Sequence, residues 1–269
     1  MGQPCIVMSL LKQIISEEKE SGRLADFSGD SFGFLPEPPA ALAAKTDDIV
    51  DIPMIVGWTS EDSSWVVPDP EGDGLTYQEF SNALQMSIGT TYPSDQVPAL
   101  YQKALVHYNM TDPSGLTPYD IRSVGIDIST DVTMKSFIVK EARQFSKAAA
   151  GSGAHVFVYE YRHRPSYSVN PAWQLVTHMD EEGMCLGLPN GPSDLSYPQT
   201  SHHDRHVSEL MTTWWSNFAK YGTPSPDWPK FGHRQDDQQI LVIRPQPEVK
   251  QFDDHEPVVL WTGSSGLDE

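Results

Sequence analysis

An uninterrupted apolar run, Ile52-Pro53-Met54-Ile55-Val56-Gly57-Trp58, is followed directly by the polar cluster Thr59-Ser60-Glu61-Asp62-Ser63-Ser64. A short apolar run ended by polar residues is typical of a strand that is buried inside a sheet. A carboxylate just beyond such a strand is held by a rigid element and can point into a cleft, as a residue that orients an imidazole must. Taken alone, Glu61 and Asp62 also fit solvated acids of a surface loop.

A second strand is predicted over residues 155–161, where the sequence HVFVYEY is rich in β-branched and aromatic residues. Further along the chain, the segment WQLVTHMDE at 173–181 places His178 between apolar residues and two acids. Polar groups that follow the carboxyl end of a strand are where α/β proteins site their chemistry, so His178 is a candidate general base. A structural histidine is the alternative.

The remaining patterns predict an α/β architecture in a single domain that spans residues 1–269. Helices are expected over 76–92, 96–108, 132–149 and 209–221, with Ser94 or Asp95 as the cap of the second helix. Strands are expected over 239–243 and 249–252. Residues 1–26 are expected to form a helical lead-in, residues 28–39 a loop, and residues 254–269 a flexible tail.

The composition narrows the class of function. The 269 residues are 38% hydrophobic, and 18 Lys and Arg stand against 37 Asp and Glu, which gives a formal net charge of −19. This surplus of negative charge repels nucleic acid phosphates and anionic lipid headgroups, so neither partner is expected. No apolar run is long enough for a membrane helix and no secretory signal is legible at the start of the chain, so a cytoplasmic location is expected by default.

Three stretches carry the patterns of a known family in the correct order: the stretch that begins at Asp131, the sequence YEYRHR at 159–164, and the sequence WWSNFAKYGTPSPDWP at 214–229. They resemble, respectively, the "tD…F" helix, the "Y.Y.Fdhr" strand and the "W.nFAk.GnPn..WP" ending of the type-B carboxylesterase, lipase and cholinesterase family. The resemblance extends from about residue 27 to residue 253. It implies the C-terminal portion of an α/β-hydrolase fold, with an incomplete sheet and flanking helices.

The same resemblance implies two catalytic residues. The family's Gly-x-x-x-Asp-Glu-Gly pattern, whose Glu is the triad acid, looks like Gly57 to Ser63 here and puts Asp62 at the acid position, with Glu61 as the second choice. The family's His-Gly-x-Glu element looks like His178-Met179-Asp180-Glu181 and puts His178 at the position of the triad base. The order acid before histidine agrees with that of α/β hydrolases.

A nucleophile is not predicted in this chain. The stretch Gly29-Asp30-Ser31-Phe32-Gly33 matches the G-x-S-x-G pattern of a nucleophile elbow. An elbow joins a buried strand to a helix, whereas this stretch follows a charged segment and runs into the proline-rich sequence LPEPP at 35–39. Ser31 is therefore expected to be a turn serine, and the nucleophile and the oxyanion hole are expected to lie outside the chain.

Two further polar clusters are expected to be structural. His202 and His206 have the i, i+4 spacing of zinc ligands with Asp204 between them, but no third spaced ligand supports a metal site. We expect a helix start there, capped by Ser201 or Asp204. The basic residues at 162–164 are expected to be a solvated strand end.

The leading hypothesis from the sequence is a serine carboxylic-ester hydrolase to which this chain supplies Asp62 and His178. The chain would be a truncated form or one subunit of a two-chain enzyme, and the second chain would carry the G-x-S-x-G elbow. The substrate would be a small-molecule ester or lactone, no cofactor is implied, and the isolated chain would be weakly active or inactive. One alternative is a non-catalytic, cholinesterase-like binding or structural protein, and another is an enzyme of unrelated chemistry in the same cleft.

Overall fold

A computed structural model describes residues 52–151, 153–192 and 200–263. All of these residues belong to the unit Ile49–Glu269. The predicted helical lead-in and the loop that contains Ser31 lie outside the described residues, and the single-domain organisation stays a prediction. In chain order the main elements are β1 (Met54–Thr59), α3 (Tyr77–Thr91), α4 (Val97–His107), α5 (Pro118–Thr130), a π-helical turn (Asp131–Lys135), α6 (Ser136–Ala148), β2 (Val156–Tyr161), α7 (Glu182–Cys185), α8 (His202–Tyr221), β3 (Gln239–Ile243), β4 (Glu248–Gln251) and α9 (His255–Thr262).

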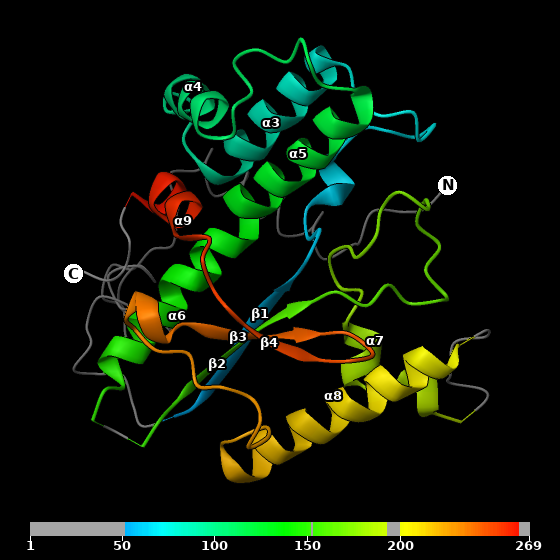
Figure 1. The fold of residues 1–269 in the computed structure, drawn as a ribbon, viewed down its shortest axis with the longest axis vertical. Helices are drawn as coiled ribbons and strands as arrows, with labels where there is room; N and C mark the ends of the chain where they lie inside the picture. Colours follow the sequence, from blue (N-terminus) through cyan, green and yellow to red (C-terminus); the bar gives the residue numbers. More distant parts are fainter. Residues whose placement is uncertain (1–51, 152, 193–199, 264–269) are drawn as a thin grey trace, which may run out of the picture. The chain divides into compact units, whose positions relative to one another are not determined.

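The four strands form one mixed sheet in the order β1-β2-β3-β4 (Figure 1). Strands β1, β2 and β3 run parallel to one another, and β4 pairs antiparallel with β3. In this register Thr59 is paired with Tyr161, so β1 and β2 end side by side. The four predicted strands are confirmed, and the loops that follow β1 and β2 leave the same edge of the sheet.

The expected burial of β1 is wrong for most of the strand. All six residues of β2 are buried, whereas Met54 to Gly57 of β1 are only partly buried, because β1 lies at the edge of the described sheet. Gly57 is required by its neighbour on β2, since a Cβ atom at this position would lie 2.4 Å from ring atoms of Tyr159. The apolar run therefore forms a strand, but within the described residues this strand is paired on one side only, with β2.

Helices cover both faces of the sheet. Because side chains alternate along a strand, Phe157, Tyr159 and Tyr161 of β2 point to one face and Val156 and Val158 to the other. The first face packs against residues of α7 and α8, which include Met184, Val207 and Met211. The second face packs against residues of α6 and α9, which include Val139, Ala142 and Val258. This arrangement of helix, sheet and helix confirms the predicted α/β class.

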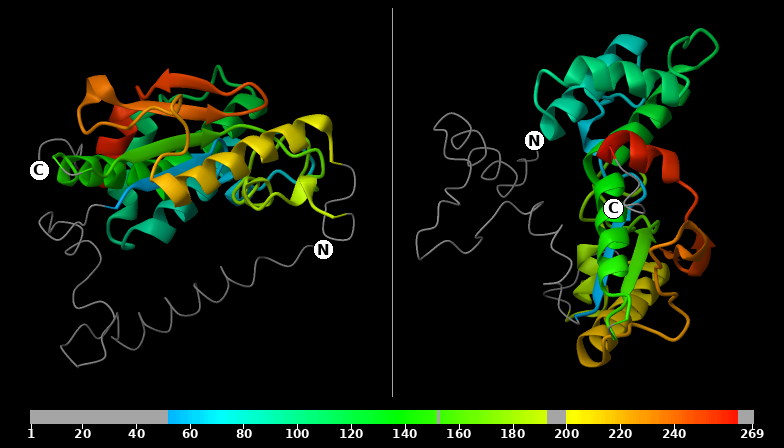
Figure 2. Two further views of the ribbon diagram at one scale, coloured as in Figure 1. Left: turned by 90° about the horizontal axis from the view of Figure 1, so that it is seen from below. Right: turned by 90° about the vertical axis from the view of Figure 1, so that its left-hand side faces the viewer.

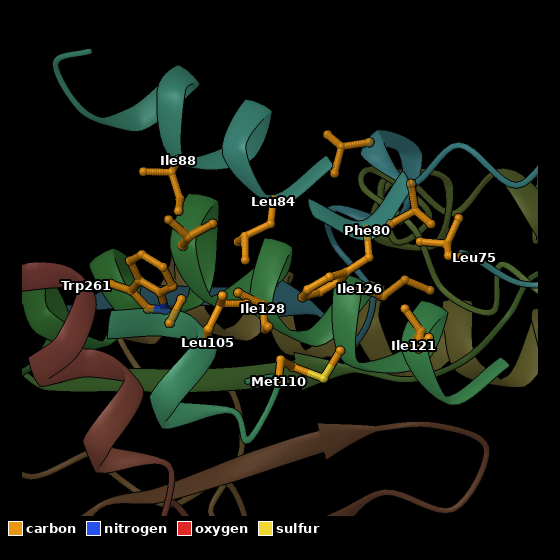
Figure 3. Packing of buried hydrophobic residues seen from close by; sticks show 14 residues of the cluster. Leu75, Phe80, Leu84, Ile88, Leu105, Met110, Ile121, Ile126, Ile128 and Trp261 are labelled. Carbon is orange, nitrogen blue, oxygen red and sulfur yellow. The ribbon is translucent and has the colours of Figure 1, made fainter. Parts of the chain in front are cut away.

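Helices α3, α4 and α5 lie together beyond the carboxyl end of β1, as Figure 1 and the right-hand view of Figure 2 show. Their apolar sides form a buried cluster that contains Phe80 and Leu84 of α3, Leu105 of α4, Ile126 of α5 and Trp261 of α9 (Figure 3). This helical layer supports the loop that leaves the end of β1.

A long helical segment replaces the predicted helix over 132–149. It runs through α5, the π-helical turn and α6 without a break, so the predicted helix begins too late. The start of this segment could have been recognised in the sequence, because Thr117 and Asp120 form a capping box and Pro118 occupies the first turn. Gly125 and the β-branched residues of α5 weaken its intrinsic helix preference, and burial against α3 offsets that weakness.

Two other expectations are wrong. A flexible tail was predicted over residues 254–269, but His255–Thr262 form helix α9, which buries Val258 and Trp261, and residues 264–269 lie outside the described residues. Helix α4 is preceded by Gln96, which makes no side-chain capping bond, so neither Ser94 nor Asp95 caps it. Among the described residues, no helix has both the length and the apolar content needed to cross a membrane.

Candidate active site

Asp62 and His178 meet where the loops after β1 and β2 come together, although they are 116 residues apart in sequence. Nδ1 of His178 lies 2.6 Å from Oδ1 of Asp62, which is within hydrogen-bond distance. An ionised carboxylate can only accept a hydrogen bond, so Nδ1 of His178 is the donor and carries a proton. When the ring is neutral, Nε2 has no proton and can accept one from another group. Asp62 is 4% exposed, whereas the side chain of His178 is 33% exposed, so the imidazole is the accessible member of the pair.

Asp62 is anchored to the strand that precedes it. Its Oδ2 accepts a hydrogen bond of 2.9 Å from the backbone N–H of Thr59. Its own backbone N–H donates to the carbonyl of Thr59 over 3.2 Å. Both carboxylate oxygens are thus occupied, one by β1 and one by the imidazole, and the carboxylate has little freedom to turn away.

A tight turn presents His178. The backbone N–H of Thr177 donates to Oδ2 of Asp180 over 2.8 Å, and the N–H of Asp180 donates back to the carbonyl of Thr177 over 3.2 Å. Met179 has a φ of 72°, in the left-handed region that residues other than glycine seldom adopt. Backbone strain of this kind is often found next to functional groups, where surrounding contacts enforce it.

Glu61, the second choice for the acid, is bonded elsewhere. Its Oε2 accepts the backbone N–H of Leu175 over 2.8 Å, and its own N–H donates to the carbonyl of Val176 over 3.0 Å. Burial raises the pKa of its carboxyl. Glu61 therefore ties the loop after β1 to the segment just before His178, and it makes no hydrogen bond to the imidazole.

The electrostatic surroundings favour a protonated imidazole. The hydrogen bond to Asp62 raises the pKa of His178 above its ordinary value of 6.5, although burial opposes this change. Glu181 and Glu182 act in the same direction as Asp62. Stabilisation of the imidazolium is what a general base needs at the moment when it accepts a proton.

Glu181 belongs to the same site, although sequence reasoning gave it no role. The hydroxyl of Tyr159 donates to its Oε1 over 3.4 Å, and its Oε2 is buried without a hydrogen-bond partner among the described residues. Burial, aided by the negative charge of Asp62, raises the pKa of Glu181 to about 7. Its position three residues after His178 was the available signal, since a short turn keeps such residues close.

The basic residues at 162–164 were expected to be solvated, and this is correct only for Arg162, whose side chain is 46% exposed. His163 is buried, and its Nε2 lies 2.8 Å from Oδ1 of Asp204. Arg164 donates to the backbone carbonyls of Asn170 and Gln174 over 2.8 and 3.1 Å. The expectation failed because these two side chains turn inward to hold the irregular loop that leads to His178.

Helix α8 begins at His202, as the capping pattern predicted, and therefore earlier than the helix expected over 209–221. Ser201 is the N-cap, and its hydroxyl accepts the backbone N–H of Asp204. Asp204 also accepts hydrogen bonds from Ser166. In the part of the chain that the structure describes, no group of three or more His, Cys, Asp or Glu side chains is arranged to hold a metal ion.

In the part of the chain that the structure describes, Asp62 and His178 have the geometry of the acid and the base of a catalytic triad. A buried carboxylate orients a partly exposed imidazole, and Nε2 makes no hydrogen bond to any residue that the structure describes. Such a pair can activate a hydroxyl that is brought to Nε2.

Comparisons with known proteins identify the family of the chain. The profile described as "Carboxylesterase family" matches residues 10–261, which include Asp62 and His178. Carboxylesterase 3 of Pongo abelii and Carboxylesterase 3 of Homo sapiens are each 24% identical to this chain over 92% of its length and 43% of their own. Liver carboxylesterase of Sus scrofa is 28% identical over 77% of this chain and 36% of its own length.

The chain thus spans less than half the length of the curated relatives named above. Its four-stranded sheet with helices on both faces is accordingly an incomplete α/β-hydrolase fold. By its sequence and its fold, the chain belongs to the carboxylesterase family and corresponds to the C-terminal part of that family.

Proposed function

We propose that this chain supplies the acid and the base of a serine carboxylic-ester hydrolase, with Asp62 as the acid and His178 as the base. The observation that supports this proposal most directly is the 2.6 Å hydrogen bond between Nδ1 of His178 and Oδ1 of Asp62. The bond forms at the edge of the sheet where two parallel strands end, which is where α/β hydrolases hold these groups.

In the proposed reaction, Nε2 of His178 takes the proton from a serine hydroxyl as the serine attacks the ester carbonyl. Asp62 keeps the proton on Nδ1 and stabilises the imidazolium that results. His178 then returns the proton to the leaving alcohol, and a water molecule activated in the same way releases the acid. The raised pKa of His178 supports the first of these steps.

The serine and the oxyanion hole are proposed to come from a second chain that carries a G-x-S-x-G elbow. Ser31 is the serine of the G-x-S-x-G stretch in this chain, and its sequence context argues for a turn. The substrate class is a small-molecule ester or lactone, and the reaction needs water and no cofactor. Without oriented oxyanion donors, the isolated chain is expected to be slower than the assembled enzyme by several powers of ten.

The test isolates the tagged full-length chain from its own cells together with whatever binds it. Hydrolysis of a short-chain nitrophenyl ester is measured, and a fluorophosphonate probe identifies by mass spectrometry the polypeptide that carries the reactive serine. We expect the label on a second chain, and a loss of hydrolysis of at least about a thousandfold in His178→Ala and Asp62→Asn. His202→Ala, which changes an exposed histidine on α8, is the matched control and should retain full activity.

Two outcomes would overturn the proposal. Enzyme-like turnover by the purified chain alone, with the label on Ser31, would show that the chain contains its own nucleophile. A purified complex that neither hydrolyses esters nor takes up the probe would instead favour a non-catalytic binding protein.

A further inference from the structure

The turn that carries Asp62 is bonded to the irregular part of the long helix. The backbone N–H of Ser63 donates to Oγ1 of Thr130, at the end of α5, over 3.2 Å. The hydroxyl of Ser63 is hydrogen-bonded to Oγ1 of Thr133, in the π-helical turn. Ser63 directly follows Asp62, so these two bonds fix the backbone beside the proposed triad acid.

The direction of the hydrogen bond between the hydroxyls of Ser63 and Thr133 follows from a second bond that Thr133 makes. Thr133 donates its hydroxyl proton to the carbonyl of Ser129 over 2.7 Å, and a hydroxyl has only one proton to donate. Thr133 must therefore accept the proton of Ser63. A threonine that bonds the carbonyl four residues back often accompanies a distorted helix, and the π-helical turn is such a distortion. The irregular turn thus offers an acceptor to the loop after β1.

The contact is sheltered from water on the side of Ser63. Ser63 and Ser129 are each 1% exposed and Thr130 is 3% exposed, whereas Thr133 is partly buried. Water therefore has little access to the groups of Ser63 if one of the two bonds is lost. The long helix is itself held at this point, because the hydroxyl of Ser129 is hydrogen-bonded to that of Ser87 on α3 over 3.1 Å.

Asp62 needs such support more than a longer acid would. Its other anchor is Thr59, at the end of β1, and β1 is the edge strand of the described sheet. An aspartate has a single methylene group, so its side chain cannot reach further if the backbone moves away from the imidazole. Catalytic groups must be held to within about 0.5 Å of their working positions.

We propose that Thr130 and Thr133 are positioning residues for the triad acid. Through Ser63 they hold the turn 59–63 where Oδ1 of Asp62 reaches Nδ1 of His178 at 2.6 Å. The proposal rests on the proposed function, in which that hydrogen bond orients the general base.

The test observes the hydrogen bond between His178 and Asp62 directly in the full chain, and it does not require a measurement of ester hydrolysis. Selective ¹⁵N labelling of histidine allows NMR detection of the Nδ1 proton of His178, which resonates far downfield when it is shared with a carboxylate, and allows titration of the ring. Thr133→Val removes the hydroxyl at nearly constant size, and we expect it to abolish the downfield signal and to lower the pKa of His178 by about half a unit or more. Thr133→Ser keeps the hydroxyl and should preserve both.

Control variants separate the positioning role from a merely structural one. Ser63→Ala should reproduce the effect of Thr133→Val, and the double variant should add little. Among the described residues, the hydroxyl of Thr90 bonds a carbonyl of its own helix, that of Ser87, over 2.7 Å. Thr90→Val removes this hydroxyl and should change nothing at His178. Asp62→Asn assigns the signal by abolishing it, while Glu181 and Glu182, which also act on His178, are the same in every variant.

A folded Thr133→Val or Ser63→Ala protein whose Nδ1 signal and His178 titration equal those of the wild type would overturn the proposal. If Thr133→Val does not fold, the comparison of Ser63→Ala with the wild type decides in its place. Failure of the proposed function looks different, because the variants would then alter the NMR signal as expected while ester hydrolysis by the assembled protein stayed independent of His178.

Discussion

Glu181 places a second carboxylate next to the pair of Asp62 and His178. Its Oε1 accepts the hydroxyl of Tyr159 and its Oε2 has no hydrogen-bond partner among the described residues, so the charged form is poorly stabilised. The pKa of about 7 means that this carboxyl is partly protonated at neutral pH, and the pKa of His178 is itself raised above its ordinary value by the hydrogen bond to Asp62. The charge of the site near neutral pH therefore depends on two groups at once.

Replacement of Glu181 by Gln should change how stability depends on pH. The folded-state pKa of Glu181 lies near 7, above the ordinary value of 4.5, so its proton favours the folded state. Its contribution to the free energy of unfolding is therefore lost as pH rises from about 4.5 to about 7. Glu181→Gln should flatten the pH dependence of the melting temperature in this window and raise the melting temperature at about pH 8.

The matched control for this prediction is Glu182→Gln, which changes the exposed neighbour. It should leave the curve of melting temperature against pH close to that of the wild type. An equal slope in Glu181→Gln and in the wild type would contradict the predicted titration of Glu181.

At the scale of elements, the irregular loop between β2 and His178 is fastened to the start of α8. Asp204, in the first turn of α8, accepts hydrogen bonds from the ring of His163, from Ser166 and from the backbone N–H of Ser201. Although burial opposes it, these hydrogen bonds lower the pKa of Asp204 to about 2. One carboxylate thus completes the capping box of α8 and holds the loop that leads to the proposed base.

Loss of this charge should destabilise the fold. We expect Asp204→Asn to lower the free energy of unfolding at neutral pH by about 2–4 kcal/mol, because several buried donors lose a charged acceptor. The folded-state pKa lies below the ordinary 3.8, so this stability is present above that value and is lost as pH falls towards about 2. Denaturation with urea at several pH values measures both effects.

Asp236→Asn, a change at an exposed position, is the control and should have little effect on stability. A difference between Asp204→Asn and the wild type that stays constant down to about pH 2 would speak against the charge as its source.

At the scale of the whole molecule, β1 is the edge strand of the sheet that the described residues form. Strand β2 has a neighbour on each side, whereas β1 is paired only with β2 among the described residues. An open strand edge with apolar residues is a place where another strand can add. The loop that holds Asp62 leaves this same strand, so the open edge and the proposed site are adjacent.

Hydrogen exchange should report the state of this edge. In the isolated chain, we expect the β1 amides that point away from β2 to exchange at least about a hundredfold faster than those of β2, because local opening costs them little. Addition of the proposed second chain should slow the exchange of these β1 amides and leave the exchange of β2 unchanged. Slow exchange at β1 in the isolated chain would mean that another part of this chain covers the edge.

The sequence alone identified those features that depend on short stretches. The four strands could be predicted because each is a brief apolar or β-branched run, and the cap of α8 because Ser201 is a polar residue next to the first helical turn. The order of two short motifs also singled out Asp62 and His178. By contrast, α9 was mistaken for a tail, because the eight residues HEPVVLWT become helical through the burial of Trp261 against elements far away in sequence.

Only the tertiary structure decided which side chains meet. The sequence placed Glu61 and Asp62 side by side, but the turn onto Thr59 directs Asp62 to the imidazole while Leu175, from a distant loop, engages Glu61. The tertiary structure likewise directs the side chain of His163 inward, to the carboxylate of Asp204. Periodicity and capping act within a few residues and can be recognised along the chain, whereas the partner of a buried charge depends on backbone groups that only the packing of distant elements brings within hydrogen-bond distance.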